Sequence, residues 1–347
     1  MTNKIYLLLV IAIAVVVLIY AQTIIIPFFL AIIFWFMIRV IKKLILRIHY
    51  FRKWPEWIFT VISTVILFSF LVFIVGIITT NIQFLSGALP NYQSNFVEIK
   101  RSIASQFNFD FDAVFSSYTK QFDFTTMLSG LLSTLTSLFS GAFTVFLYLI
   151  FLLLEEASFS KKISAMYPDE DKYKKMYSLI SKIDQSVQQY IALKTVVSLI
   201  TGILSYFTLI FIGVDAPAFW AFLIFVLNFI PNIGSLVATL FPAIFALFQF
   251  GELTQGFLVL LIVGMIQMVI GNFVEPKIMG KSLNISPLVV LLTLAVWGVM
   301  WGFTGMLLSV PITVILIIIM AEFPSTRPLA ILLSQDGLIN NEEEIQQ

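Results

Sequence analysis

The sequence predicts an all-α protein that crosses a lipid membrane several times. Hydrophobic residues make up 60% of its 347 residues and charged residues only 11%, whereas soluble domains carry roughly 25% charged residues. The mean hydropathy of +1.01 agrees with this composition. Several apolar runs reach the roughly 20 residues that a helix needs to cross the hydrocarbon layer. Inside that layer only helices or closed barrels pair every backbone polar group, and helices suit runs of this length.

Six runs have the length and composition of ordinary transmembrane spans. They are residues 5–21, 24–41, 57–80, 131–154, 193–212 and 256–274. The first lacks a small-residue cleavage site and is soon followed by another apolar run, so it is predicted to be a retained span. The loop 39–56 carries six basic residues against Glu56 alone, which marks the cytoplasmic side of the membrane. Counting spans from this loop places both termini in the cytoplasm.

The spans divide the chain into four predicted parts. Residues 1–154 form a four-span amino-terminal part that includes an outer amphipathic segment at 81–129. Residues 155–192 form a cytoplasmic amphipathic helix. Residues 193–323 form a core of two span-plus-hairpin units, and the remaining residues, 324–347, form a cytoplasmic tail.

Two segments outside the spans show helical periodicity. In the outer segment, apolar residues recur at steps of three and four: Leu85, Leu89, Tyr92, Phe96, Ile99, Ile103 and Phe107. This stripe packs on its own protein or at the lipid surface, or it forms a subunit contact. The inner segment has acidic residues after Pro168, as the first turn of a helix favours, and this helix is predicted to run directly into the span at 193.

The segment 218–250 is too long for one span. As a single helix it would measure roughly 50 Å. Its middle reads NFIPNIGS, in which Pro231 removes a backbone donor and Gly234 frees the backbone. The amides of Asn228 and Asn232 also stand at membrane depth. We expect a helical hairpin with two arms too short to span; the alternative is one long helix kinked by Pro231 and Gly234.

The segment 287–321 is also overlong and is interrupted by WGVMWGFTG before Pro311. Each interrupted segment follows an ordinary span, and on this topology the first enters from outside and the second from inside. The two units therefore form an inverted repeat, in which Gly234 and Pro242 correspond to Gly302 and Pro311. Paired interruptions of this kind mark the binding site of a transporter, because freed backbone groups face a cavity.

Polar and small residues around these interruptions are the candidate solute-binding residues. They are Asn228, Pro231, Asn232, Gly234, Ser235, Thr239, Asn272, Trp297, Gly298, Gly302 and Gly305. For each of them the alternative is ordinary helix packing or an interhelical hydrogen bond. Asp215 is predicted to cap the first hairpin on the outer side, with an ion-binding role as the alternative.

The linker NFVEPKIMGKSLNISP, residues 272–287, is predicted to be a hinge at the cytoplasmic edge. Pro276 ends one helix, Gly280 permits a turn, and Ser286 with Pro287 begins the next helix. Glu275 either secures this joint by pairing with Lys277 and Lys281 or couples transport to an ion.

Several other kinds of function are excluded by the residues that the sequence lacks. The chain has no cysteine and a net charge of +1, so it offers no thiolate chemistry and suggests no nucleic-acid partner. It has no phosphate-binding loop of the ATPase type. His49 is the only histidine and lies in the basic loop, so neither a metalloprotease motif nor a serine–histidine pair exists at membrane depth. We expect no enzyme activity, metal or cofactor.

Three blocks of sequence carry a resemblance to a known family. FIPNIGSLVATLFPAI at 229–244, NFVEPKIMGKSLNISPLVVLLTLAVWG at 272–298 and GMLLSVPITVI at 305–315 resemble the signature blocks of the autoinducer-2 exporter family, the PerM-like permeases. Asn232 and Ser235 resemble the branch that contains the autoinducer-2 exporter itself. The resemblance implies a homo-oligomer, with a pentamer considered, that lies in the inner membrane and moves a small polar solute outward.

The leading functional prediction is therefore a secondary transporter or facilitated exporter of the quorum-sensing signal autoinducer-2, with membrane lipid around it. Its two hairpins would meet near the middle of the membrane. Some members of the resembled family are assigned sodium/proton exchange, so a monovalent cation/proton antiporter using Glu275 or Asp215 is the second hypothesis. A third is an oligomeric membrane scaffold that acts through its amphipathic helices.

Overall fold

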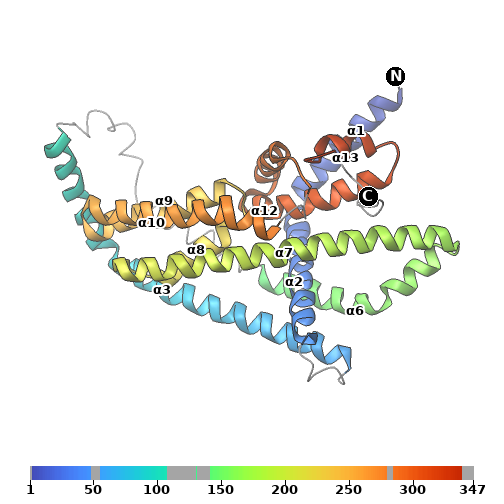
Figure 1. Ribbon diagram of the computed structural model, residues 1–347, viewed down its shortest axis with the longest axis horizontal. Helices are drawn as coiled ribbons and strands as arrows, with labels where there is room; N and C mark the ends of the chain where they lie inside the picture. Colours follow the sequence, from blue (N-terminus) through green and yellow to red (C-terminus); the bar gives the residue numbers. More distant parts are fainter. Residues whose placement is uncertain (1, 48–54, 108–129, 131–140, 280–283, 338–347) are drawn as a thin grey trace. The chain divides into compact units, whose positions relative to one another are not determined.

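The computed structural model describes residues 2–47, 55–107, 130, 141–279 and 284–337 (Figure 1). In this part of the chain all regular secondary structure is helical. Six of the described helices are long and apolar enough to cross a membrane, or seven if one bent pair counts as a single span. The predicted class, an all-α polytopic membrane protein, is confirmed.

The amino-terminal helices are α1 (Thr2–Tyr20), α2 (Gln22–Leu46) and α3 (Glu56–Phe107). Only Ala21 separates the first two. The third is 52 residues long, and its apolar part ends at Leu85. The predicted span at 57–80 and the beginning of the outer amphipathic segment therefore form one continuous helix.

The middle of the chain forms two helices. Helix α6 (Ala142–Met166) bends by 63° at residue 157, and the preceding ten residues of the predicted span lie outside the described part. Helix α7 (Glu170–Ile212) is 43 residues long. The carboxylate of Asp169 accepts hydrogen bonds from two backbone N–H groups in its first turn, both at 3.1 Å. The prediction that the inner helix runs directly into the span at 193 is confirmed.

The carboxy-terminal half contains shorter elements. They are α8 (Pro217–Leu227), α9 (Ile233–Phe250), α10 (Leu253–Val269), the π turn η2 (Ile270–Val274), α11 (Glu275–Met279), α12 (Pro287–Glu322) and α13 (Arg327–Leu333). Helix α12 begins at Pro287 with Ser286 before it, as predicted. Gly280 and Lys281, which belong to the predicted hinge, lie outside the described residues.

The chain folds into two compact units. The first unit comprises residues 1–65, 141–193 and 279–347, and the second comprises 66–140 and 194–278. The boundary near residue 193 coincides with the beginning of the predicted core. The second interrupted segment, however, belongs to the first unit, so the predicted functional division at 193–323 stays a prediction.

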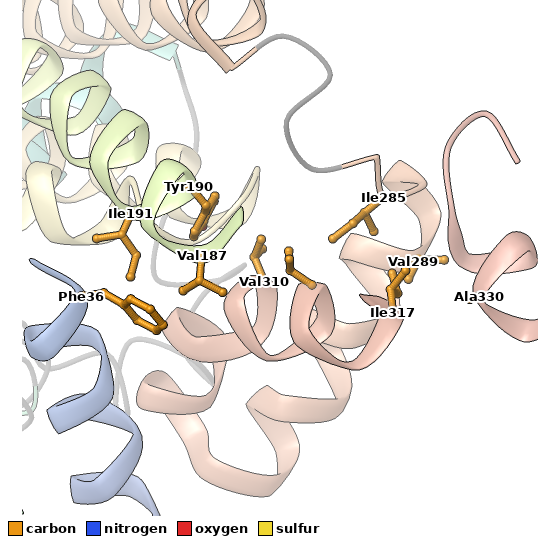
Figure 2. Packing of buried hydrophobic residues seen from close by; sticks show 10 residues of the cluster. Phe36, Val187, Tyr190, Ile191, Ile285, Val289, Val310, Ile317 and Ala330 are labelled. Carbon is orange, nitrogen blue, oxygen red and sulfur yellow. The ribbon is translucent and has the colours of Figure 1, made fainter. Parts of the chain in front are cut away.

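The core of the first unit is formed by α2, α7, α12 and α13. Figure 2 shows Phe36 of α2 beside Val187 and Ile191 of α7, with Val310 of α12 facing them. At the polar end of this core, the Trp35 indole N–H donates to Glu156 at 2.7 Å, and the same carboxylate lies 3.5 Å from the guanidinium of Arg39. These contacts tie α2 to α6.

The core of the second unit is formed by α8, α9 and α10. Trp220 of α8 is buried against Phe219, at 5.0 Å between ring centroids, and against Phe245 of α9, at 4.9 Å. Helices α9 and α10 lie side by side (Figure 1). A side chain at Gly256 of α10 would overlap Leu247 of α9, so a glycine there lets the two helices approach closely.

Candidate functional site

The first predicted interruption is a true break between two helices. Helix α8 ends at Leu227 and α9 begins at Ile233, and Asn232 adopts a positive φ of 57°. A Cβ atom at Gly234 would overlap the Leu227 carbonyl oxygen, so only glycine fits where the chain folds back. Because Trp220 and Phe245 pack together across the two arms, the predicted hairpin is confirmed and the single kinked helix is wrong.

One detail of the hairpin differs from the prediction. Helix α8 has 11 residues and is too short to span, as expected. Helix α9 has 18 residues and passes the length and composition test for a span, so the expectation that both arms are short is wrong. The break lies in the first half of the segment, after the 11 residues of α8 and before the 18 residues of α9, of which Gly234 is the second.

This break borders a cavity of about 510 Å³ in the second unit. Its wall comes from the beginning of the span in α7, the turn 228–232, α9, α10 and the π turn. Seven of the predicted residues line it: Asn228, Pro231, Asn232, Ser235, Thr239, Asn272 and Glu275. Gly234 does not line the cavity but holds the turn that carries these side chains. Residues separated by up to 47 positions are thus brought to one site.

Three side chains on the hairpin side of the cavity already donate a hydrogen bond within the protein. The Asn228 amide donates to the Ser198 hydroxyl at 3.1 Å, and the Ser235 hydroxyl donates to the Asn232 carbonyl at 2.8 Å. The Thr239 hydroxyl donates to the Ser235 carbonyl at 2.8 Å. Oxygen lone pairs of these side chains stay available, so this side of the cavity is rich in hydrogen-bond acceptors.

A buried ion pair forms another part of the wall. The ammonium of Lys194 on α7 pairs with the carboxylate of Glu275, and their side chains are 4% and 24% exposed. We expected Glu275 to pair with Lys277 and Lys281; the described partner is instead Lys194. Glu275 therefore joins α11 to α7, and it does so at the cavity. A solute there would meet a pair without net charge.

The backbone widens immediately before Glu275. In the π turn Ile270–Val274, the Glu275 N–H donates to the Ile270 carbonyl, five residues back. The turn places both Gly271 and Asn272 on the cavity wall. The prediction that Pro276 ends the helix is wrong, because helix α11 continues to Met279. Pro276 lies directly after the π turn, at the second position of α11.

The second predicted interruption is confirmed in α12 of the first unit. Trp301 and Gly302 have non-helical backbone angles, with φ of −128° and 59°. A Cβ atom at Gly305 would overlap the Trp297 carbonyl oxygen, in the way that one at Gly234 would overlap Leu227. Gly305 thus shares this close approach with Gly234, and the predicted correspondence of Gly234 with Gly302 stays a prediction. The inverted orientation of the two units stays a prediction.

The predicted residues around this second break do not line the cavity of the second unit. Trp301 is buried, donates from its indole to the Leu18 carbonyl at 3.0 Å, and lies 4.7 Å from Trp297 between ring centroids. The two tryptophans therefore pack against the amino-terminal helices. A solute-binding role for Trp297, Gly298, Gly302 and Gly305 stays a prediction, as does the meeting of the two hairpins.

Asp215 lies at the beginning of the first hairpin but does not cap it. Its carboxylate accepts a hydrogen bond from the Tyr92 hydroxyl at 2.8 Å, and Ala216, in the left-handed conformation, occupies the N-cap position of α8. Burial, together with the hydrogen bond to Asp215, raises the pKa of Tyr92 well above its ordinary value. Asp215 therefore holds the outer part of α3 to the hairpin.

The outer amphipathic stripe is covered by its own protein where it is described. Leu85 is fully buried and Tyr92 is 4% exposed, and the Tyr92 ring lies edge-on to Phe245 at 5.2 Å. Asn95 donates to the carbonyls of Phe248 and Gln249 at the end of α9, at 3.0 and 2.8 Å. The first alternative for this stripe is confirmed at these positions.

Comparison with known proteins identifies the family. A model of the AI-2E family transporters matches residues 7–325. The chain belongs to the AI-2E transporter family. A Haemophilus influenzae relative named "Putative transport protein" is 32% identical over 323 residues, covering 90% of each chain. The AI-2 transport protein TqsA of Escherichia coli is 31% identical over 321 residues, covering 91% of this chain and 90% of its own.

A Borreliella burgdorferi relative, also named "Putative transport protein", is 33% identical over 268 residues, covering 75% of this chain and 72% of its own. The AI-2E family member described here is therefore a membrane transporter. The resemblance drawn from the three sequence blocks is confirmed. The long apolar helices of the fold agree with a membrane transporter family.

Two polar cavity residues of this AI-2E transporter, Lys194 and Gln267, were not predicted. Lys194 stands at the beginning of an apolar run, where a lysine is usually a membrane-boundary residue. Gln267 lies within an apolar run, and this isolated amide at membrane depth was the signal that could have identified it. Both residues come from ordinary spans and not from the interruptions.

Proposed function

We propose that this AI-2E transporter is a secondary transporter or facilitated exporter of a small polar solute, with autoinducer-2 as the first candidate, and that the solute binds in the cavity of the second unit. The single observation that carries the proposal is the cavity itself. It gathers seven polar or break-forming residues that sequence alone had selected, and its volume of about 510 Å³ suits a small molecule.

The chemistry of the wall suits a hydroxyl-rich, uncharged solute. Amide and hydroxyl groups of Asn228, Asn232, Ser235 and Thr239 supply hydrogen-bond partners, and the charges of Lys194 and Glu275 compensate each other. Autoinducer-2 is a small hydroxylated furanone derivative. The name of the TqsA relative, an AI-2 transport protein, supports the same candidate.

The backbone around the cavity has two places that are not α-helical, the turn 228–232 and the π turn at 270–274. Such breaks are where a helical transporter changes shape with little loss of hydrogen bonding. We propose that movement at these two places exposes the solute to alternate sides. The proposal includes an inner-membrane location, cytoplasmic termini and a homo-oligomer, a pentamer being the assembly to test.

Efflux from proteoliposomes tests the proposal. Vesicles loaded with autoinducer-2 are compared with and without the purified chain, and the proposal predicts faster efflux with the chain. Equal efflux would contradict it. In the same vesicles, proton movement triggered by sodium in the absence of any solute effect would instead favour the antiporter hypothesis. If both activities are absent and only variants of the outer amphipathic stripe have a phenotype, the scaffold hypothesis is favoured.

A further inference from the structure

Gln267 of α10 has an unsatisfied hydrogen-bond donor at the cavity. Its side chain is more than nine-tenths buried, and its amide nitrogen has no hydrogen-bond partner among the described residues. The same residue borders the cavity. Buried polar groups are nearly always paired in folded proteins, because an unpaired buried donor has lost its hydrogen bonds to water without replacement. A group that departs from this rule beside a cavity is a candidate for ligand binding.

The space beside Gln267 is open along the helix. Gly264 lies three residues before it and Gly271 four residues after it, and both also line the cavity. A Cβ atom at Gly271 would meet no atom within 4 Å, and one at Gly264 would meet only Thr239 at 3.6 Å. The terminal torsion of a glutamine is soft, so a small rotation turns the amide toward this space.

The opposite wall has the complementary polarity. The hydroxyl hydrogens of Ser235 and Thr239 are donated to backbone carbonyls, and one N–H of the Asn228 amide is donated to Ser198. These side chains therefore offer oxygen acceptors to a solute. The ammonium of Lys194 is held by Glu275. The cavity thus has oxygen acceptors at Asn228, Ser235 and Thr239 and an unused donor on α10.

We propose that Gln267 is a specificity-determining residue that donates from its amide nitrogen to a carbonyl or equivalent acceptor oxygen of the solute. The solute's hydroxyl groups then face Asn228, Ser235 and Thr239, so that the cavity binds it in one orientation. This inference rests on the proposed function and adds the substrate class to it: a small ring or chain with hydroxyls on one edge and an acceptor oxygen on the other.

Two small-molecule probes test whether the cavity has a donor at Gln267 opposite the acceptors of the hairpin. Erythronolactone carries two hydroxyls and a carbonyl on a five-membered ring, and anhydroerythritol is the same dihydroxylated ring without the carbonyl oxygen. Titration calorimetry on the purified full chain in lipid nanodiscs should show about tenfold tighter binding of erythronolactone, the range expected for one added hydrogen bond to a buried donor. Equal binding by the parent protein, or binding of neither probe, would overturn the proposal.

The matched variants are Gln267→Met and Gln255→Met. Both glutamines lie on α10 and both have a buried side-chain atom without a partner among the described residues, but only Gln267 lines the cavity. Gln267→Met should bind the two probes equally, while Gln255→Met should keep the parent's preference. A preference retained in Gln267→Met would overturn the proposal even if the variant were less stable, because the preference is a ratio measured on one protein.

The probe-binding test of Gln267 and the efflux test of the proposed function can fail independently. Autoinducer-2 efflux by the parent, with no discrimination between the probes, contradicts the role of Gln267 alone. Discrimination between the probes without autoinducer-2 efflux supports the role of Gln267 and contradicts autoinducer-2 as the solute.

Discussion

Lys194 on α7 and Glu275 on α11 form an ion pair in the wall of the polar cavity. The two residues are not equally buried, since the lysine side chain is 4% exposed and the glutamate side chain 24% exposed. Removing one partner of a buried pair leaves the other charge unpaired, and the penalty grows with the burial of the charge that remains. The pair therefore predicts an asymmetric result of mutation.

Glu275→Gln should destabilise the protein more than Lys194→Met. The first leaves an ammonium in a nearly closed site, at a loss of about 3 kcal/mol, whereas the second leaves a carboxylate that still reaches solvent. The double variant should recover part of the stability lost by Glu275→Gln. Thermal unfolding midpoints in detergent measure this order. Glu170→Gln is the control, because its pair with Lys174 at 2.8 Å is exposed and should matter little.

Gly234→Ala and Gly305→Ala should each destabilise the helical break that they occupy. A methyl group at Gly234 overlaps the Leu227 carbonyl, and one at Gly305 overlaps the Trp297 carbonyl; overpacking of this kind typically removes about 1–3 kcal/mol. Gly76→Ala is the control, since a Cβ there meets no atom within 4 Å. Midpoints for the two variants equal to that of the control would show that the close approach is not required.

Thr239→Val should slow solute efflux, while Thr208→Val should not. Both threonines donate to a backbone carbonyl four residues back, at 2.8 and 3.0 Å, so the two changes remove the same local hydrogen bond. Only Thr239 lines the cavity. An effect of about tenfold on the apparent KM fits the loss of one hydrogen bond to the solute. Similar kinetics for the two variants would place the solute elsewhere.

Asn232 is better replaced by glycine than by alanine. Its φ of 57° is strained for residues with a larger side chain than glycine, so alanine would combine strain with loss of the amide. Asn232→Gly should keep the hairpin and reduce efflux. Parent-like efflux from this variant, with an unchanged unfolding midpoint, would remove Asn232 from the binding site.

Tyr92 predicts a loss of stability at alkaline pH. Its pKa is raised in the folded protein, first by burial and then by the hydrogen bond to Asp215. The folded state therefore holds the phenol proton more tightly than the unfolded state, and this contribution is complete below the unfolded pKa of about 10 and is lost as pH rises above it. The midpoint should fall more steeply above about pH 10 in the parent than in Tyr92→Phe.

Much of the fold was readable because it depends on local rules. Pro231 and Gly234 lie close together in an apolar run and predict the first break. The segment WGVMWGFTG, at 297–305, predicts the second break. The length of α9 differs from the prediction because the position of the break within residues 218–250 depends on tertiary packing. The chain folds back where Gly234 lies against the Leu227 carbonyl. Pro276 likewise predicts a helix end, but α11 continues to Met279. The π turn before it has no recognisable pattern of residue types.

The site was only partly readable, for a different reason. Asn228, Asn232 and Ser235 could be selected because polar residues beside a break in a membrane helix are conspicuous. Lys194 and Gln267 lie in uninterrupted helices, and their place at the cavity depends on how α7 and α10 pack against the hairpin. A single sequence does not predict how helices that are distant in sequence pack together. The sequence therefore predicts an ion pair of Glu275 with the nearby Lys277, whereas the structure pairs Glu275 with Lys194.

The most direct test of the solute site uses the absence of cysteine from the chain. Ser235→Cys places one thiol at the cavity, and Ser164→Cys places one at an exposed position of α6. The rate of modification by a methanethiosulfonate reagent is measured in proteoliposomes with and without autoinducer-2. We expect the solute to slow modification of Ser235→Cys and to leave Ser164→Cys unchanged. Equal rates for Ser235→Cys with and without saturating solute would contradict binding in this cavity.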